Sequence, residues 1–224
     1  MKRLIISLSI LLFAATSMQA ESLTKEQQLL LKQRAAQKVS LFTGYITKIA
    51  DKVESLEHRL YFKDAALKLF IGKGQSYNEY YIQSNGQQVK VERDGVKMQV
   101  TSVRTGSKRD LLMRSYLYNL AHLKYSKVEV QTTDVAHMRV SNLEKVGKDT
   151  YRCVCFFKQS FVGYKDGVPV YRDITEKKVE CIINGIDTPD GYEYEVFLGD
   201  VTAAETQSIN GEISPETIRD IVNS

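Results

Sequence analysis

The chain of 224 residues is 43% hydrophobic and 26% charged and has only three prolines, a composition that indicates a globular protein and excludes a disordered one. Its formal net charge is +4, but loss of Lys2 and Arg3 with a leader takes the 31 basic residues to 29, against 27 acidic ones. A chain so close to neutral lacks the concentrated basic face of a nucleic-acid-binding protein.

Residues 1–20 have the pattern of a secretory signal peptide. Lys2 and Arg3 give a positive start, an apolar run from Leu4 to Ala15 follows, and Ala20 ends a stretch of mostly small residues. The run is too short to span a membrane comfortably, and no later stretch is apolar enough. We therefore expect an exported, periplasmic or secreted protein without a transmembrane anchor.

Residues 22–60 are predicted to form one long helix, in which Thr24 and Gln27 make a capping box. Apolar residues recur at alternating steps of four and three, which predicts a helix with one apolar face. That face could pack on a sheet or, because the spacing is also that of heptads, pair with a helix of another chain. The apolar residues are Ala35, Val39, Phe42, Ile46, Ile49, Val53, Leu56 and Leu60.

The middle of the chain mixes helical and strand patterns. Ser107, with Asp110 three residues on, is expected to start a helix that runs to about Leu123. An Asp94-Gly95 turn is expected to join two strands into a hairpin. The full set is a short helix at 63–72, a loop or poor strand at 73–85, strands at 87–92 and 96–103, the helix at 107–123, and strands at 127–131 and 135–143.

Three long strands are predicted at 151–162, 170–183 and 191–201. Each alternates apolar and polar side chains, which is typical of an antiparallel sheet with one covered face. Asp166-Gly167 supplies a turn between the first two strands, and Pro189 to Gly191 supplies one between the last two. Pro169 donates no backbone hydrogen bond, so it indicates an edge or a bulge near the first turn.

Two of these strands carry all three cysteines. In an exported protein Cys181 could form a disulfide with Cys153 or Cys155, of which we single out Cys155 with Cys181. A strict two-residue turn would instead pair Cys153 with Glu180, and one bulge would correct this register. The alternative is that all three are small buried side chains. A metal site is not expected, because the spacing is wrong and no histidine lies near.

The sequence predicts three parts: the signal peptide at 1–20, an α+β domain at 21–204, and a C-terminal tail at 205–224. The tail is polar at first and then forms a short helix, with Ser214 as cap and Pro215 at its first position. In the domain, we expect the N-terminal helices to pack on a strongly curved, mainly antiparallel sheet.

This order of helices and strands, from Leu23 to Thr202, resembles the nuclear-transport-factor-two-like fold, also called the cystatin-like cone. The stretches from Gln159 to Tyr164 and from Tyr171 to Thr175 are similar to exported domains of this type from Bacteroides-like bacteria. The resemblance implies a bent sheet that wraps helices and leaves a pocket at its open end. The fold hosts both enzymes and non-catalytic binding modules, so the resemblance fixes no activity.

Enzymes of this fold use a carboxylate or a histidine–aspartate pair as a base in the pocket, which makes two residues weak catalytic candidates. His137 lies beside Asp134 on an expected strand. Asp173 follows Tyr171 and could sit at a pocket mouth, or it could be a solvated strand end paired with Lys177 or Arg172. No phosphate-binding loop, serine elbow or cysteine–histidine pair is present in the sequence, and no cofactor is expected.

Five aromatic residues on the three strands could line a ligand pocket or form the core against the helices. They are Phe157, Phe161, Tyr171, Tyr192 and Tyr194.

Three functions fit these patterns. The first is a non-catalytic module that binds a small ligand or a protein and could form a homodimer through its sheet face. The second is a lyase or isomerase of the same fold that acts on a small apolar substrate, with Asp173 or His137 as base. The third is a structural envelope protein that associates through its first helix.

Overall fold

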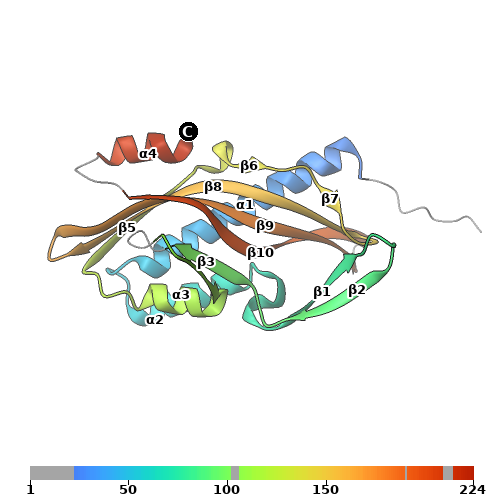
Figure 1. The fold of residues 1–224 in the computed structure, drawn as a ribbon, viewed down its shortest axis with the longest axis horizontal. Helices are drawn as coiled ribbons and strands as arrows, with labels where there is room; N and C mark the ends of the chain where they lie inside the picture. Colours follow the sequence, from blue (N-terminus) through green and yellow to red (C-terminus); the bar gives the residue numbers. More distant parts are fainter. Residues whose placement is uncertain (1–22, 102–105, 190, 209–213) are drawn as a thin grey trace, which may run out of the picture.

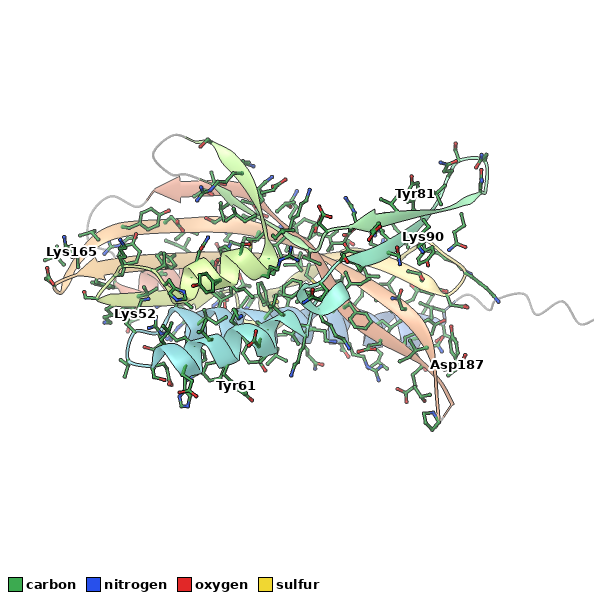
Figure 2. All side chains as sticks on the ribbon, turned by 90° about the horizontal axis from the view of Figure 1, so that it is seen from below. Lys52, Tyr61, Tyr81, Lys90, Lys165 and Asp187 are labelled. Atoms are coloured by element: carbon green, nitrogen blue, oxygen red, sulfur yellow. The ribbon has the colours of Figure 1, made fainter. Side chains whose placement is uncertain are left out.

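The computed structural model describes residues 23–101, 106–189, 191–208 and 214–224, so the predicted signal peptide lies outside the described residues. It is an α+β structure in which N-terminal helices pack on a long, curved sheet, as predicted (Figure 1). The ends of the long strands, marked by Lys165 and Asp187, lie at opposite ends of the molecule (Figure 2). Among the described residues, no helix is long and apolar enough to cross a membrane.

The first helix, α1 (Lys25–Ala50), begins at the predicted capping box and lies on the sheet. The residues of its predicted apolar face from Ala35 to Ile49 are buried. The prediction that it continues to Leu60 is wrong: Asp51 is extended, and Val53 is 95% exposed. The Asp51 carboxylate accepts a hydrogen bond from the Val53 backbone, a local contact that competes with the helical ladder. Because the sheet covers the apolar face of α1, that face offers no seam to a partner helix.

A second helix, α2 (Leu56–Leu67), follows with Ser55 as its cap and packs on α1. The short helix predicted at 63–72 therefore has the wrong bounds. The helix begins seven residues earlier, and the single turn η1 (Ile71–Gly74) stands where the predicted helix would end. Gly72 has a φ of +71°, a conformation that glycine adopts without strain and that ends the helical path.

The strands after η1 do not pair as predicted. β1 (Tyr77–Ile82), expected to be a loop or a poor strand, forms a separate hairpin with β2 (Gln88–Arg93), while β3 (Lys97–Thr101) joins the main sheet. The predicted hairpin about Asp94-Gly95 is therefore wrong. In Figure 2 the β1–β2 hairpin, marked by Tyr81 and Lys90, extends away from the helices.

The predicted helix from Ser107 to Leu123 is wrong in its first part. Lys108–Leu112 form a strand, β4, which pairs antiparallel with β3, and only Met113–Ala121 are helical, as α3. Pairing with β3 overrides the local helical pattern, which is a common outcome where tertiary contacts favour another structure.

The main sheet has the strand order β4-β3-β10-β9-β8-β5. Its centre is the predicted meander of β8 (Thr150–Lys165), β9 (Val168–Thr188) and β10 (Gly191–Ser208), with β5 (Lys127–Thr132) at one edge. All neighbours are antiparallel except β10 and β3. The predicted strand at 135–143 is reduced to the turn η2 (Val135–His137) and β6 (Arg139–Val140), which with β7 (Glu144–Lys145) pairs along β8.

A bulge sets the register of β8 on β9. Asp166 and Gly167 both have positive φ in the two-residue turn, and Lys165 faces Val168. Val170 is then an extra residue, because Gly163 faces Tyr171 while Tyr164 faces Pro169. The register moves by one residue, so that Cys153 faces Cys181.

The outer face of the sheet, opposite the helices, is partly covered at both ends. At one end α4 (Pro215–Asn223), capped by Ser214 as predicted, buries Ile218 and Val222 beside β5 and β8. β10 continues to Ser208, beyond the predicted end at Val201 and into the region expected to be a loose tail. At the other end the β1–β2 hairpin is fastened by ion pairs.

These ion pairs involve Glu79 of β1. Its carboxylate lies 2.7 Å from Arg93 Nε and 2.6 Å from an Arg152 guanidinium nitrogen, and Arg152 Nε lies 2.9 Å from Glu180 Oε1. Arg152 therefore links a hairpin carboxylate to one on β9. The carboxylates repel each other, and burial and this repulsion raise the pKa of Glu180, while Arg152 opposes the shift.

Candidate functional site

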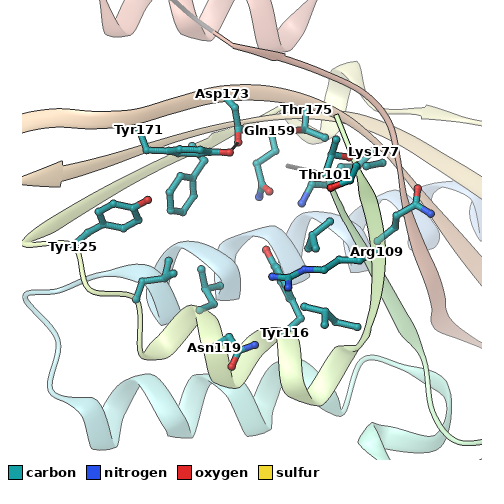
Figure 3. A pocket seen from close by; sticks show the side chains of 18 residues that line it. Thr101, Arg109, Tyr116, Asn119, Tyr125, Gln159, Tyr171, Asp173, Thr175 and Lys177 are labelled. Atoms are coloured by element: carbon teal, nitrogen blue, oxygen red, sulfur yellow. Dashed lines mark hydrogen bonds between the residues drawn. The ribbon is translucent and has the colours of Figure 1, made fainter. Parts of the chain in front are cut away.

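A cavity of about 560 Å³ lies between the inner face of β8 and β9 and the helix α3, with β3 and β4 along one side (Figure 3). Its size is within the range of small-molecule sites. The lining mixes apolar and polar side chains: Gln99, Val100, Thr101, Ser107, Arg109, Leu111, Tyr116, Asn119, Leu120, Leu123, Tyr125, Gln159, Phe161, Tyr171, Asp173, Thr175, Lys177 and Ala203.

One carboxyl group is held in the cavity wall. The Tyr171 hydroxyl donates to Asp173 Oδ2 at 2.5 Å, and both side chains come from the inner face of β9. Burial raises the pKa of Asp173, while the hydrogen bond from Tyr171 and the charge of Lys177 oppose the shift. Burial and the same hydrogen bond raise the pKa of Tyr171. The pair can therefore bind or release a proton closer to neutral pH than an exposed carboxyl would.

Lys177 lies four residues further along the same face of β9 and is only 8% exposed. Its Nζ is 5.8 Å from the centre of the Tyr116 ring, and among the described residues it has no hydrogen-bond or ion-pair partner. Burial lowers the pKa of Lys177 to about 8, with a smaller opposing effect of Asp173. The ammonium group thus enters the cavity without a counter-ion.

Two further polar side chains reach the same space. Gln159 of β8 is 5% exposed, and its amide makes no hydrogen bond within the described part of the chain. Figure 3 shows Gln159 pointing into the cavity and Arg109 extending into it from β4. Arg109 also has no ion pair among the described residues. Buried polar groups normally have partners, so Gln159 is available to a molecule in the cavity, and Arg109, which is exposed, can reach the same molecule from the solvent side.

Glycine at position 163 allows an aromatic ring to close one side of the cavity. A Cβ at Gly163 would lie 2.7 Å from the Tyr125 ring, so the ring rests directly on the backbone of β8. Tyr125 and Phe161, whose ring centres are 6.1 Å apart, form the wall there.

The structure brings together only some of the residues singled out from the sequence. Phe161, Tyr171 and Asp173 line the cavity, whereas Phe157 is buried in the core. Tyr192 and Tyr194 lie on the part of β10 that pairs with the far end of β9, where Tyr194 contacts Tyr151. His137 is exposed in η2 and does not line the cavity. Asp173 is paired with Tyr171 and makes no ion pair with Lys177 or Arg172 among the described contacts.

Several polar or aromatic residues of the cavity lining were not among the predicted site residues, notably Arg109, Tyr116, Gln159 and Lys177. Two of them left a signal in the sequence. Gln159 follows Cys153, Cys155 and Phe157 at the odd positions of its strand, and Lys177 precedes Val179 and Cys181 in the same way. A polar residue in an apolar series indicates a place where the covered face of a strand is not filled by core.

The three cysteines are buried free thiols in this structure. Cys155 Sγ and Cys181 Sγ are 3.7 Å apart, and Cys153 is the direct neighbour of Cys181 across the strands. The Cys155–Cys181 disulfide stays a prediction. Within the described ranges, no group of three or more histidine, cysteine or acidic residues is arranged to hold a metal ion.

Comparisons with known proteins add a likeness of fold. No protein-family model matches the chain, and no curated protein matches it. The crystal structure of the Kfla4162 protein from Kribbella flavida is 13% identical, with a TM-score of 0.35 over 80% of this chain and 95% of that one. A hexachlorocyclohexane dehydrochlorinase (LinA) type 2 is 10% identical, with a TM-score of 0.38 over 85% of this chain and 97% of its own. At these identities and TM-scores, neither likeness supports an inference about this chain.

Proposed function

We propose that this chain is a binding module that takes a small, mainly apolar ligand into the cavity beneath β8 and β9. The observation that carries the proposal is the pair of side chains Gln159 and Lys177, each more than nine-tenths buried, directed at the cavity and without partners among the described residues. The polar atoms of both side chains face the cavity space, where a ligand with complementary groups can hydrogen-bond to them. Apolar walls from Leu120, Leu123 and Phe161 supply the rest of the contact.

A neutral fluorescent probe tests the proposal. N-phenyl-1-naphthylamine, which brightens in apolar surroundings, is expected to bind the wild-type protein. Replacing Leu123 with tryptophan should weaken binding at least about tenfold, because the larger side chain fills space that the probe needs, and tenfold corresponds to about 1.4 kcal/mol. The matched control is Val53→Trp, at an exposed position outside the cavity, which should bind as the wild type does. If the wild type does not bind the probe, or Leu123→Trp binds it equally well, the proposal fails.

A second candidate function is acid–base catalysis by Asp173. The specific observation is a carboxyl group in a cavity with a raised pKa and a hydrogen-bonded tyrosine beside it, an arrangement that suits removal of a proton from carbon. This would make the chain a lyase or isomerase for a small apolar substrate. The other catalytic candidate, His137, is exposed outside the cavity, so Asp173 is the residue to test.

Exchange of carbon-bound hydrogen gives that test. Cyclohexanone in deuterated water should lose its α-hydrogens faster with the protein present, as followed by proton NMR. The catalysed rate should rise with pH as Asp173 loses its proton, with a midpoint above the ordinary range of an aspartate because its pKa is raised. Asp173→Asn should abolish the acceleration and His137→Gln should leave it unchanged. An unaccelerated wild-type reaction, or an active Asp173→Asn variant, counts against this candidate for such ketones.

Export and dimer formation complete the proposal. The signal-peptide pattern of residues 1–20 supports an exported protein, and an oxidising compartment would permit the Cys155–Cys181 bond. A homodimer through the sheet would use the outer face between α4 and the β1–β2 hairpin. There Phe156 is flanked by Arg139 and Lys178, whose charged groups lie 5.3 Å and 5.5 Å from its ring centre.

A further inference from the structure

The described lining of the cavity has an excess of positive charge. Lys177 and Arg109 contribute two cations, and Asp173 contributes the one carboxyl group. Because burial raises the pKa of Asp173 and Tyr171 already donates a hydrogen bond to it, this carboxyl only partly compensates the two cations.

Distance also separates the carboxyl from the ammonium group. Asp173 and Lys177 are four residues apart on one strand, so their Cα atoms are about 13 Å apart at the usual rise of a β-strand. No ion pair joins them in the described structure. The carboxyl end, with Tyr171, and the ammonium end, with Tyr116, are therefore two different places in the cavity.

In the described part of the lining, the ammonium end has hydrogen-bond donors and no acceptor with a negative charge. Lys177 lies diagonally across the strand pair from Gln159, which faces Thr175. Arg109 enters from β4, on the other side of the space. An ammonium, a guanidinium and an amide are the groups that proteins use to bind oxyanions, and hydrogen bonds between charged partners are the stronger ones.

We propose that the ligand of this cavity is an apolar organic anion, whose single oxyanion group binds between Lys177 and Arg109 and whose apolar body lies against α3 and Phe161. This inference rests on the proposed binding function and names the class of ligand. The anion gives the ammonium of Lys177 the partner that the described chain does not provide. The Tyr171–Asp173 pair remains free to donate or accept a hydrogen bond at the other end of the ligand.

Two probes that differ by one charged group test the inference. 8-Anilinonaphthalene-1-sulfonate has the ring system of N-phenyl-1-naphthylamine plus a sulfonate, so the ratio of their dissociation constants measures preference for the anion. We expect the wild type to bind the sulfonate at least about tenfold more tightly. Lys177→Met should remove most of this preference while binding of the neutral probe persists. The matched control is Lys178→Met, the next residue on β9, which is exposed on the outer face and should keep the preference.

The outcomes separate this inference from the proposed function. If the wild type binds both probes equally, the ligand class is wrong while the binding function stands, and this comparison requires no variant. If Lys177→Met keeps the preference and remains folded by circular dichroism, the assignment to Lys177 is wrong. If the neutral probe fails to bind the wild type, the binding function fails and the inference fails with it. If Leu123→Trp leaves sulfonate binding unchanged, the anion binds outside the cavity, which also overturns the inference.

Discussion

Replacing Lys177 with methionine is expected to stabilise the ligand-free protein by up to about 3 kcal/mol at pH 7. Burial lowers the pKa of Lys177 from 10.5 to about 8, and each unit of difference between the folded and unfolded pKa corresponds to about 1.4 kcal/mol. Methionine has a similar length and carries no charge to bury, and replacing buried charged groups with apolar ones is often stabilising. Denaturant unfolding of both proteins at pH 7 measures the difference.

The pH dependence of this effect has a defined sign. Between about pH 8 and 10.5 the unfolded chain keeps the Lys177 proton that the folded chain has lost, so the free energy of unfolding rises with pH. The advantage of Lys177→Met should therefore shrink as the pH rises from 8 to 10. The charged or titratable groups facing Lys177 are Asp173 on its own strand, Tyr116 on α3 and Arg109 on β4. Lys178→Met, an exposed control, should change stability by less than about 0.5 kcal/mol. A destabilised Lys177→Met protein, or an advantage independent of pH, contradicts the account of Lys177 as a buried cation.

Replacing Phe42 with alanine is expected to destabilise the protein by about 3–5 kcal/mol. Phe42 lies on the buried face of α1, is 1% exposed, and meets Phe70 edge-on with ring centres 4.9 Å apart. The substitution removes this contact and leaves a cavity in the core. The unfolding free energy from urea or guanidinium titration measures the loss.

The neighbouring residue gives a control on the same helix. Leu41 is 49% exposed, so Leu41→Ala should cost less than about 1 kcal/mol in the isolated protein. The two variants together distinguish a helix that belongs to the core from one that serves a partner. If Phe42→Ala were as harmless as Leu41→Ala, α1 would not be packed on the sheet as described.

The parts of the fold that could be predicted correctly are those that depend on residues close together in the sequence. The alternation in β8, β9 and β10, the Asp166-Gly167 turn and the caps at Thr24 and Ser214 each depend on residues a few positions apart. The errors fall where distant contacts decide. Lys108–Leu112 become a strand because β3 lies beside them, and β1 is a strand because β2 pairs with it.

The candidate site was predicted only in part, because local patterns indicate some of its residues and distant contacts place the others. Tyr171, Asp173 and Phe161 were found because an acid beside aromatic residues on one strand face is a recognisable pattern. Lys177 was considered only as a partner for Asp173, because a lysine on a strand is usually solvated. Its burial follows from the approach of α3 and Tyr116, which no local pattern in β9 specifies.

The bulge at Val170 determines which side chains of β9 point into the cavity. If Val170 paired with Gly163 and no bulge formed, the two faces of β9 would exchange, and Arg172, Ile174 and Glu176 would point inward in place of Asp173, Thr175 and Lys177. The same slip would drive Lys178 and Glu180 into the apolar core where Val179 and Cys181 now lie. The burial of Val179 and Cys181 further along β9 therefore holds the bulge in place and, through it, directs Asp173 and Lys177 into the cavity.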